Sequence, residues 1–287
     1  MSADFILGKD ALKQTQKSLK ALKSHQKVEG QSQASPIYLT INIKIKLIKI
    51  KDYKSRIIPV THKLNKVENK SILLITKDPS NIYREELLKK DSPTEDSFNE
   101  IISLKKLKSL SKNSKNLIKL YKENDIVVCD FRIFKFLPDI LGTIFYLKNK
   151  KIPYMIQMNK SSPTQQLTKT KQNKLKDNNC DSKYVQNQLK SIVGNPSFIP
   201  TSNLGDVINL KIGYTNWDLE KLITNINDVL IYLVDDKHRP LGGIINIDQL
   251  GNIHVRCDNS ISLPVLVKHE EIIGVDEDNE NDSDFDF

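Results

Sequence analysis

The sequence predicts an α/β fold built in two parts, and two patterns along the chain indicate it. Residues 37–47 alternate between apolar and polar side chains, which is typical of a strand with one buried and one wet face. Between residues 72 and 158 the pattern changes to short apolar runs separated by helical stretches, which is typical of a parallel sheet covered on both faces. With 287 residues, 38% of them hydrophobic, the chain can bury a core in each part.

A helix and the alternating strand make up the N-terminal part. Residues 9–27 place leucines on one face and lysines on the others, which predicts a helix. In the strand, isoleucine and leucine at alternate positions form the face expected to be buried. The opposite, wet face carries Tyr38, Thr40, Asn42, Lys44 and Lys46. The alternation breaks at Ile48, where we expect a bulge or a bend, and residues 56–60 are the expected hairpin partner of the strand.

Short strands and helices alternate through the middle of the chain. A lysine-rich helix is expected at residues 107–121 and a helical stretch at 133–137, after which Pro138 opens and Gly142 closes another helical turn. Apolar runs predict strands at residues 72–76, 101–104, 126–130 and 154–158. Strands that alternate with helices in this way predict a parallel, Rossmann-like sheet.

The pattern returns to longer elements after a polar stretch. Residues 159–181 are expected to form a linker or a solvated crossing, and residues 182–193 a helix. A strand at 207–212 ends at Gly213. The apolar residues of the next helix, 219–233, keep the 3.6-residue period, and Thr215 with Asp218 resembles a capping box at its start.

Two closing strands and an acidic segment end the chain. After a turn at residues 241–243, strands are expected at 253–257 and 263–267. The last twelve residues, 276–287, hold seven acidic and no basic side chains and are expected to be disordered. The whole chain has a net charge of +9, and without this segment 44 basic residues stand against 28 acidic ones. Such an excess suits a polyanionic partner, although a general drift of composition toward lysine explains the same numbers.

The sequence offers no set of residues for catalysis, a cofactor or a metal. It has no glycine-rich phosphate loop after a predicted strand. Its three cysteines, Cys129, Cys180 and Cys257, are far apart, odd in number and in no C-x-x-C pair, which argues against a zinc site and against a disulfide framework. Asp130 at the end of a strand is interpreted as a helix cap rather than a catalytic acid, and Asp235 to His238 as a turn rather than a metal site. The N-terminus lacks the layout of a secretory signal, and no apolar run has the length of a membrane span, so an intracellular protein without cofactor or metal is expected.

Two stretches of the chain together resemble the ribosomal L1-domain family. In residues 123–157 an apolar strand ends at Asp130, Arg132 follows, and then come Leu137-Pro138, Leu141-Gly142 and a lysine run before Pro153. The second stretch consists of LKIG at residues 210–213, a helix, and IHVRCDNSISLPV at residues 253–265. The order and spacing of these motifs are similar to those of the family over roughly residues 9–267.

The resemblance implies a two-domain, L1-like α/β fold. A discontinuous α/β sandwich domain is assembled from both ends of the chain, and a Rossmann-like domain is inserted into it. The expected boundaries are 1–68 for the first part of domain one, 69–158 for the inserted domain, 159–275 for a linker and the second part of domain one, and 276–287 for the acidic tail.

The family also implies RNA binding by domain one. The matching positions in this sequence are His62, Lys211, Gly213, Trp217, Arg256, Asn259 and Ser260. We add Lys44 and Lys46 from the wet face of the long strand to this set.

Several positions differ from the ribosomal members and are similar to nucleolar L1-like biogenesis factors. Thr61, Trp217 and the loop at residues 257–260 depart from the ribosomal pattern, whereas ISLKKLK at 102–108 and SLPV at 262–265 match the biogenesis factors. The resemblance therefore implies a non-catalytic nucleolar protein that binds pre-rRNA, other assembly factors and ribosomal proteins, with no membrane and no small-molecule substrate.

Three alternatives accompany this interpretation. The short sequence after domain one favours a factor of the small-subunit processome over one of the large-subunit pre-ribosome. A scaffold that contacts only proteins is a second alternative. An enzyme that uses the inserted domain is a third, and the missing phosphate loop speaks against it.

Overall fold

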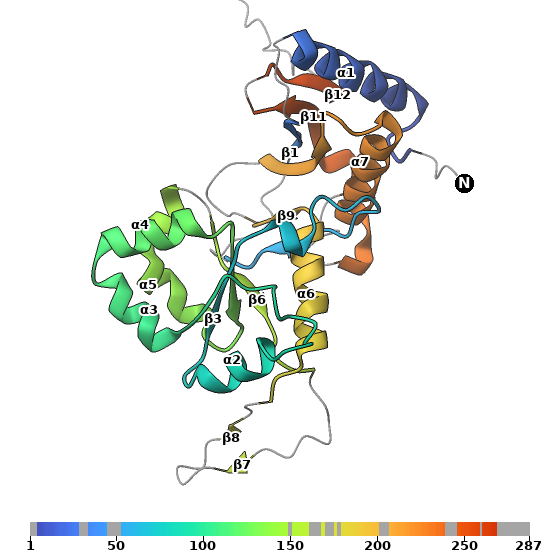
Figure 1. Ribbon diagram of the computed structural model, residues 1–287. Helices are drawn as coiled ribbons and strands as arrows, with labels where there is room; N and C mark the ends of the chain where they lie inside the picture. The colour runs from blue at the N-terminus through green and yellow to red at the C-terminus, as the bar shows by residue number, and fades with distance from the viewer. Residues whose placement is uncertain are drawn as a thin grey trace, which may run out of the picture.

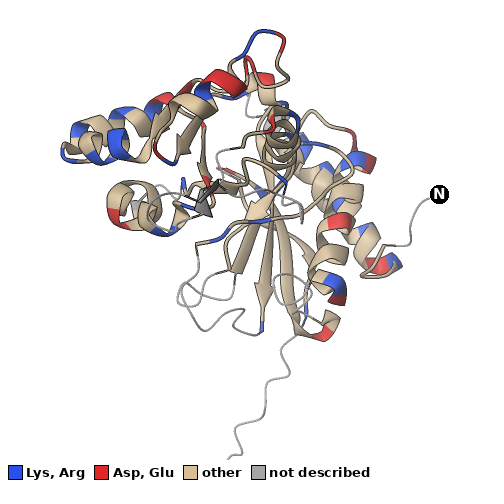
Figure 2. Cartoon of the chain, turned by 90° about the horizontal axis from the view of Figure 1, so that it is seen from below, with Lys and Arg blue, Asp and Glu red and all other residues tan. Residues whose placement is uncertain are grey.

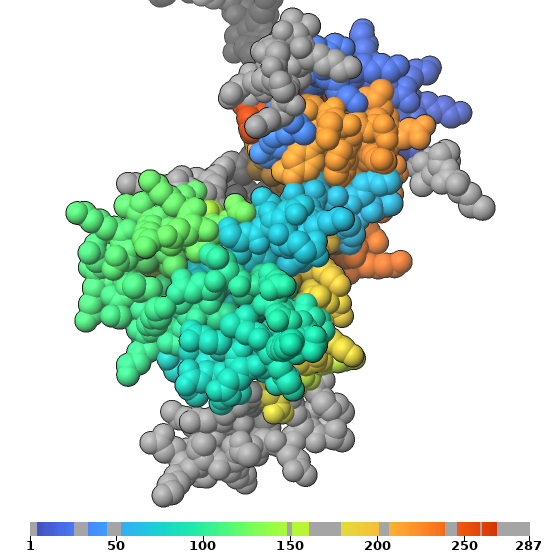
Figure 3. Space-filling model, viewed as in Figure 1, coloured from blue at the N-terminus to red at the C-terminus, as the bar shows by residue number. Residues whose placement is uncertain are grey.

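The computed structural model describes ten stretches of the chain. They are residues 5–28, 34–44, 53–148, 151–160, 168–169, 175–176, 179–200, 207–238, 246–258 and 260–268. Two sheets, each with its own helices, form two lobes of the molecule (Figure 1). Figure 3 shows the same two lobes as continuous packed surfaces.

The first unit is an antiparallel sheet with helices on one face. Its strands are β1 (Pro36–Ile43), β10 (Val207–Tyr214), β11 (Leu250–Cys257) and β12 (Leu263–Leu266), in the order β10-β1-β11-β12. Alternate residues of β1 are buried, as its sequence predicts, and pack with α1 (Lys9–Val28) and α7 (Leu219–Val234). The central strand comes from the N-terminal half of the chain and its neighbours from the C-terminal half, so neither half can form this core alone.

The second unit is a parallel sheet of four strands in the order β4-β3-β5-β6. They are β3 (Ile72–Thr76), β4 (Glu100–Ser103), β5 (Ile126–Asp130) and β6 (Tyr154–Ile156). Leu73 and Ile75 of β3 pack toward one face, under α3 (Leu104–Ser111), α4 (Ser114–Glu123) and α5 (Leu137–Thr143). Ile72 and Leu74 pack toward the other, under α2 (Asn81–Leu87) and α6 (Ser182–Gly194). Burial on both faces explains why these strands are uninterrupted apolar runs.

The remaining elements are short strands and single helical turns outside the two four-stranded sheets. The strand β2 (Arg56–Ile57) pairs with β9 (Ser197–Phe198) where the chain passes between the lobes. The strands β7 (Thr168–Lys169) and β8 (Leu175–Lys176) pair with each other. Single helical turns are η1 (Val67–Asn69), η2 (Phe134–Phe136), η3 (Ile144–Lys148), η4 (Asp236–His238) and η5 (Ile247–Gln249).

Three expectations about these elements were wrong. Residues 56–60 are not the hairpin partner of β1, because both edges of β1 are taken by β10 and β11. The helix expected at 107–121 is two helices, because Asn113 accepts a hydrogen bond from the backbone N–H of Lys115 (2.9 Å) and so begins a new helix. Thr215 takes no part in a capping box, because its hydroxyl accepts the backbone N–H of Ser35 (3.1 Å).

Other expectations concern α6 and the segments outside the described residues. Helix α6, which we placed with the second part of domain one, packs on the parallel sheet through Val185 and Leu189. The bend expected at Ile48, the turn at 241–243 and the acidic segment 276–287 lie outside the described residues. The division into domains at the predicted boundaries stays a prediction.

Candidate nucleic-acid interface

A β-bulge in β10 shapes the polar face of the first unit. Ile37 lies opposite Gly213 but Tyr38 lies opposite Lys211, so Ile212 is an extra residue on the β10 side. Ile212 and Gly213 are both buried, whereas Lys211 and Tyr214 are half-buried. In a regular strand residues three apart point to opposite faces, and the bulge turns Lys211 and Tyr214 to the same face.

Lys211 and Tyr214 are in direct contact as a result. The Lys211 ammonium donates a hydrogen bond to the Tyr214 hydroxyl (2.8 Å) and lies 4.0 Å from the centre of its ring. The Tyr214 hydroxyl donates in turn to Oδ1 of Asn65 (2.6 Å), which lies in the loop after β2. This chain of contacts fixes a positive charge and a polar aromatic ring at the rim of the sheet.

A row of three side chains crosses the sheet beside this pair. Tyr38 of β1 is opposite Lys211 of β10 on one side and Arg256 of β11 on the other. The Arg256 guanidinium carbon lies 5.8 Å from the centre of the Tyr38 ring. Burial and the nearby carboxylate of Asp258 raise the pKa of Tyr38 above its ordinary value. Two cations that flank an aromatic ring suit a phosphate–base unit of RNA.

The next row along the sheet is polar and uncharged. Thr40 of β1 lies opposite Asn209 of β10 and His254 of β11, and the Thr40 hydroxyl donates to Oδ1 of Asn209 (3.3 Å). The polar face therefore joins hydrogen-bonding groups to the two cations, and its charge is lower than the lysine count of the chain suggests.

Gly213 and Trp217 belong to the support of this face. A Cβ atom at Gly213 would lie 2.5 Å from Leu222 Cδ2 and 2.8 Å from Trp217 Cε3, so only glycine allows this packing. The Trp217 ring lies 5.8 Å from that of Tyr214, centre to centre. The Trp217 carbonyl accepts a hydrogen bond from the Lys23 ammonium of α1 (2.6 Å). Trp217 thus joins the rim of the sheet to two helices.

Asn225 of α7 holds His62 next to the bulge. Its side chain is fully buried and accepts the backbone N–H of His62 (3.0 Å). Its amide group donates to the carbonyls of His62 and of Ile212, both at 2.9 Å. Because Ile212 is the bulged residue, Asn225 supplies the partner that its carbonyl would otherwise lack.

The remaining predicted residues are dispersed. The Ser260 hydroxyl accepts the backbone N–H of Cys257 (2.8 Å) and donates to the Ile261 carbonyl (3.1 Å), so it holds the turn between β11 and β12. Lys44 is exposed at the far end of β1, six residues from Tyr38 and therefore roughly 20 Å away. Lys46 and Asn259 lie outside the described residues.

The structure thus brings His62, Lys211 and Arg256 to one region and leaves Lys44 apart. Sequence reasoning missed Tyr214, Asn65 and Asn225. A signal for Asn225 was present, because it falls on the apolar face of α7 between Leu222 and Ile226. A polar residue in that position is typical of a buried hydrogen-bonding group.

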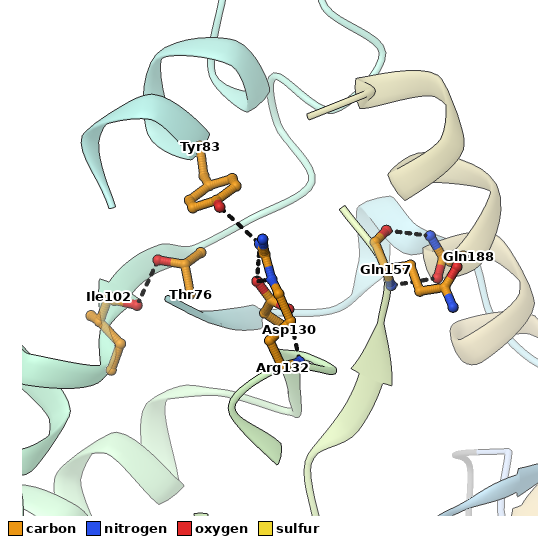
Figure 4. A network of polar contacts seen from close by, with 7 residues as sticks. All are labelled: Thr76, Tyr83, Ile102, Asp130, Arg132, Gln157 and Gln188. Atoms are coloured by element: carbon orange, nitrogen blue, oxygen red, sulfur yellow. Dashed lines mark hydrogen bonds and ion pairs between the residues drawn. The ribbon is translucent and has the colours of Figure 1, made fainter. Parts of the chain in front are cut away.

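The carboxyl ends of the parallel strands hold a second polar network (Figure 4). Asp130 is fully buried, accepts the Arg132 backbone N–H (3.0 Å) and forms an ion pair with the Arg132 guanidinium. Arg132 also donates to the Tyr83 hydroxyl (2.8 Å). Burial alone would lower the pKa of Arg132, but the hydrogen bonds and charge of Asp130 outweigh it and raise that pKa. Asp130 therefore stabilises the turn after β5. The helix cap expected at this position was wrong, because Ile133 and Phe136 are the N-cap residues of the two helical segments that follow.

The described residues contain neither a membrane-spanning helix nor a group of metal-binding side chains. No helix in these stretches is long and apolar enough to cross a bilayer. No three histidine, cysteine or acidic side chains within them lie close enough together to hold a metal ion. Cys129 and Cys257 are buried and form no disulfide, and burial raises the pKa of the Cys180 thiol to about 12.

Comparisons with known proteins point to one family and one process. Residues 12–261 match the ribosomal protein L1p/L10e family, a stretch that includes every residue of the polar face. The chain is 41% identical over 231 residues to the ribosome biogenesis protein UTP30 of Saccharomyces cerevisiae, and the match covers 80% of each protein. It is 25% identical over 194 residues to the putative ribosome biogenesis protein C8F11.04 of Schizosaccharomyces pombe, or 67% of this chain and 44% of that protein.

Proposed function

The chain belongs to the ribosomal protein L1p/L10e family, and from this premise we propose that it is a non-catalytic ribosome-biogenesis factor that binds pre-rRNA. Its similarity to two proteins named for ribosome biogenesis supports ribosome assembly as the process. The observation that supports RNA contact is the row of Lys211, Tyr38 and Arg256, with Tyr214 turned onto the same face by the bulge.

The chemistry of this row fits single-stranded or looped RNA. Lys211 and Arg256 supply charge for phosphates, and the tyrosine rings supply surfaces on which bases stack. The loop of His62 and Asn65 lies at the same rim and offers further hydrogen-bonding groups. The protein acts in the nucleolus, in the small-subunit processome, with pre-rRNA, other assembly factors and ribosomal proteins as its partners. The 41% identity to UTP30, a ribosome biogenesis protein, supports ribosome assembly as the process.

Binding of a labelled RNA hairpin to the full chain tests the RNA contact. The double variant Lys211→Gln, Arg256→Gln should bind more weakly and lower the slope of log affinity against log salt concentration by about two, one for each lost phosphate contact. The matched control is Lys89→Gln, Lys90→Gln, which removes the same charge from exposed residues after α2. Absence of RNA binding by the unaltered chain at low salt would leave the protein-only scaffold as the surviving proposal.

Crosslinking in cells tests the assignment to a particle. Sites mapped within the small-subunit part of the precursor rRNA would support the proposal, and a cluster in the large-subunit spacer would contradict it. Saturable nucleotide binding by the purified chain would contradict the non-catalytic assignment and favour an enzyme.

A further inference from the structure

Helices α3 and α4 of the second unit carry a dense set of exposed lysines. Residues 104–122 contain seven lysines and no acidic residue. All seven are exposed, and Figure 2 shows basic residues along these helices. The seventh, Lys106, forms an ion pair with Glu100 (2.8 Å). We define the lysine stripe as the other six: Lys105, Lys108, Lys112, Lys115, Lys119 and Lys122.

The spacing of these lysines places them on the outer side of both helices. Leu107 of α3 and Leu117 and Leu120 of α4 are buried against the parallel sheet. The lysines follow at intervals of three and four residues, which is the spacing of one side of a helix. At 1.5 Å per residue, each helix carries its three lysines over roughly 10 Å. The surface of these residues is the green flank of the lower lobe in Figure 3.

The fold leaves most of this charge unpaired. Lys119 forms the only ion pair of the stripe within the described part of the chain, 3.6 Å from Glu123. Like charges three and four residues apart destabilise a helix. Lys105 and Lys115 also lie in the first turns of their helices, where the helix dipole disfavours cations. The arrangement therefore costs stability in the isolated protein, and a bound polyanion would remove that cost.

We propose that the lysine stripe is a second RNA-contact surface, which binds the phosphate backbone without regard to sequence. The inference rests on the proposed function, because it takes pre-rRNA as the polyanion. Residues 104–122 contain no arginine, and their one aromatic residue, Tyr121, is half-buried with the Lys151 ammonium 3.9 Å from the centre of its ring. The stripe therefore supplies point charges rather than groups that read bases. The stripe lies on the second unit, whereas the row of Lys211 and Arg256 lies on the first. Because one chain carries both surfaces, an RNA bound at one of them binds the other as an intramolecular step, which raises the overall affinity.

The experiment measures RNA binding by the full chain with Lys108→Gln, Lys112→Gln and Lys115→Gln combined. None of these three side chains lies in an ion pair within the described residues, and none is buried. The matched control combines Lys89→Gln, Lys90→Gln and Lys183→Gln, which are exposed on the α2 and α6 side of the same sheet. The probe is an RNA duplex of mixed sequence, and binding is measured by fluorescence anisotropy over a range of salt concentrations.

We expect the stripe variant to bind on the order of tenfold more weakly, with a salt slope lower by about three, while the control variant resembles the unaltered chain. Equal affinity and slope in the two triple variants would overturn the inference, even where the unaltered chain binds RNA and the proposed function stands. Failure of the unaltered chain to bind would instead overturn the proposed function. Unchanged RNA affinity with weakened binding of a synthetic peptide of residues 276–287 would overturn the RNA assignment in favour of an acidic peptide.

Discussion

Replacement of Asn225 by alanine should destabilise the first unit by about 3 kcal/mol. The Asn225 side chain makes three hydrogen bonds, to the N–H and the carbonyl of His62 and to the carbonyl of Ile212. The Ile212 carbonyl is buried and outside the ladder, so leaving it unpaired costs about 1–3 kcal/mol, whereas the half-buried His62 groups regain water and cost about 0.5–1 kcal/mol each. Urea unfolding followed by fluorescence of Trp217, the single tryptophan of the chain, measures the loss in this unit.

Asn227→Ala is the control for this prediction. Asn227 is also buried in α7 but accepts one hydrogen bond, from the Ile6 N–H (3.0 Å), so its loss should cost about 1 kcal/mol. A second variant, Asn225→Asp, places a carboxylate against two carbonyl oxygens, which should raise the pKa of the new acid. Its stability should then be greatest at low pH and fall as pH rises through the raised pKa. A loss for Asn225→Ala no larger than that for Asn227→Ala would refute the role given to the bulge.

Three further substitutions test other parts of the structure. Gly213→Ala should cost about 1–3 kcal/mol, because its Cβ would lie 2.5 Å from Leu222 Cδ2, and a urea midpoint equal to that of the unaltered chain would contradict the packing. Asp130→Ala should cost about 2–4 kcal/mol in calorimetry, because it leaves the partly buried Arg132 without its ion pair, and an unchanged melting temperature would show that the pair does not hold the turn. Lys115→Glu should stabilise α4 by about 0.5–1 kcal/mol, through the helix dipole and a new i,i+4 pair, and should weaken RNA binding. A loss of both stability and binding would indicate damage to the helix.

Periodic patterns in the sequence predicted the elements of the fold well. The alternation in β1 gave its buried face, and apolar runs gave the parallel strands, because both patterns follow directly from which faces are covered. The order of strands in the antiparallel sheet did not follow, because it depends on pairing between residues near 40 and residues beyond 207. The hairpin expected between β1 and residues 56–60 failed for that reason.

The site was predicted less completely than the fold. Lys211 and Arg256 came from a family resemblance, and Tyr38 from the wet face of its strand, yet their common row needed the register of three strands. A glycine within a strand indicates a bulge, and the sequence mark of this one is Gly213. We interpreted Gly213 as the end of the strand, whereas β10 continues to Tyr214. Tyr214 was therefore not expected on the face of Lys211.

The position of β1 between β10 and β11 sets the order in which the protein can fold during its synthesis. Strand β1 is made early, but its two partners emerge only after residues 207 and 250. At translation rates of 5–20 residues per second, β1 waits roughly 10–40 s with both edges unpaired, while the whole parallel sheet is already available to form. The row of Lys211, Tyr38 and Arg256 is thus complete only after β11 has been made, whereas the lysine stripe on the second unit can form before that. Until then the unpaired edges of β1 are open to pairing with another chain.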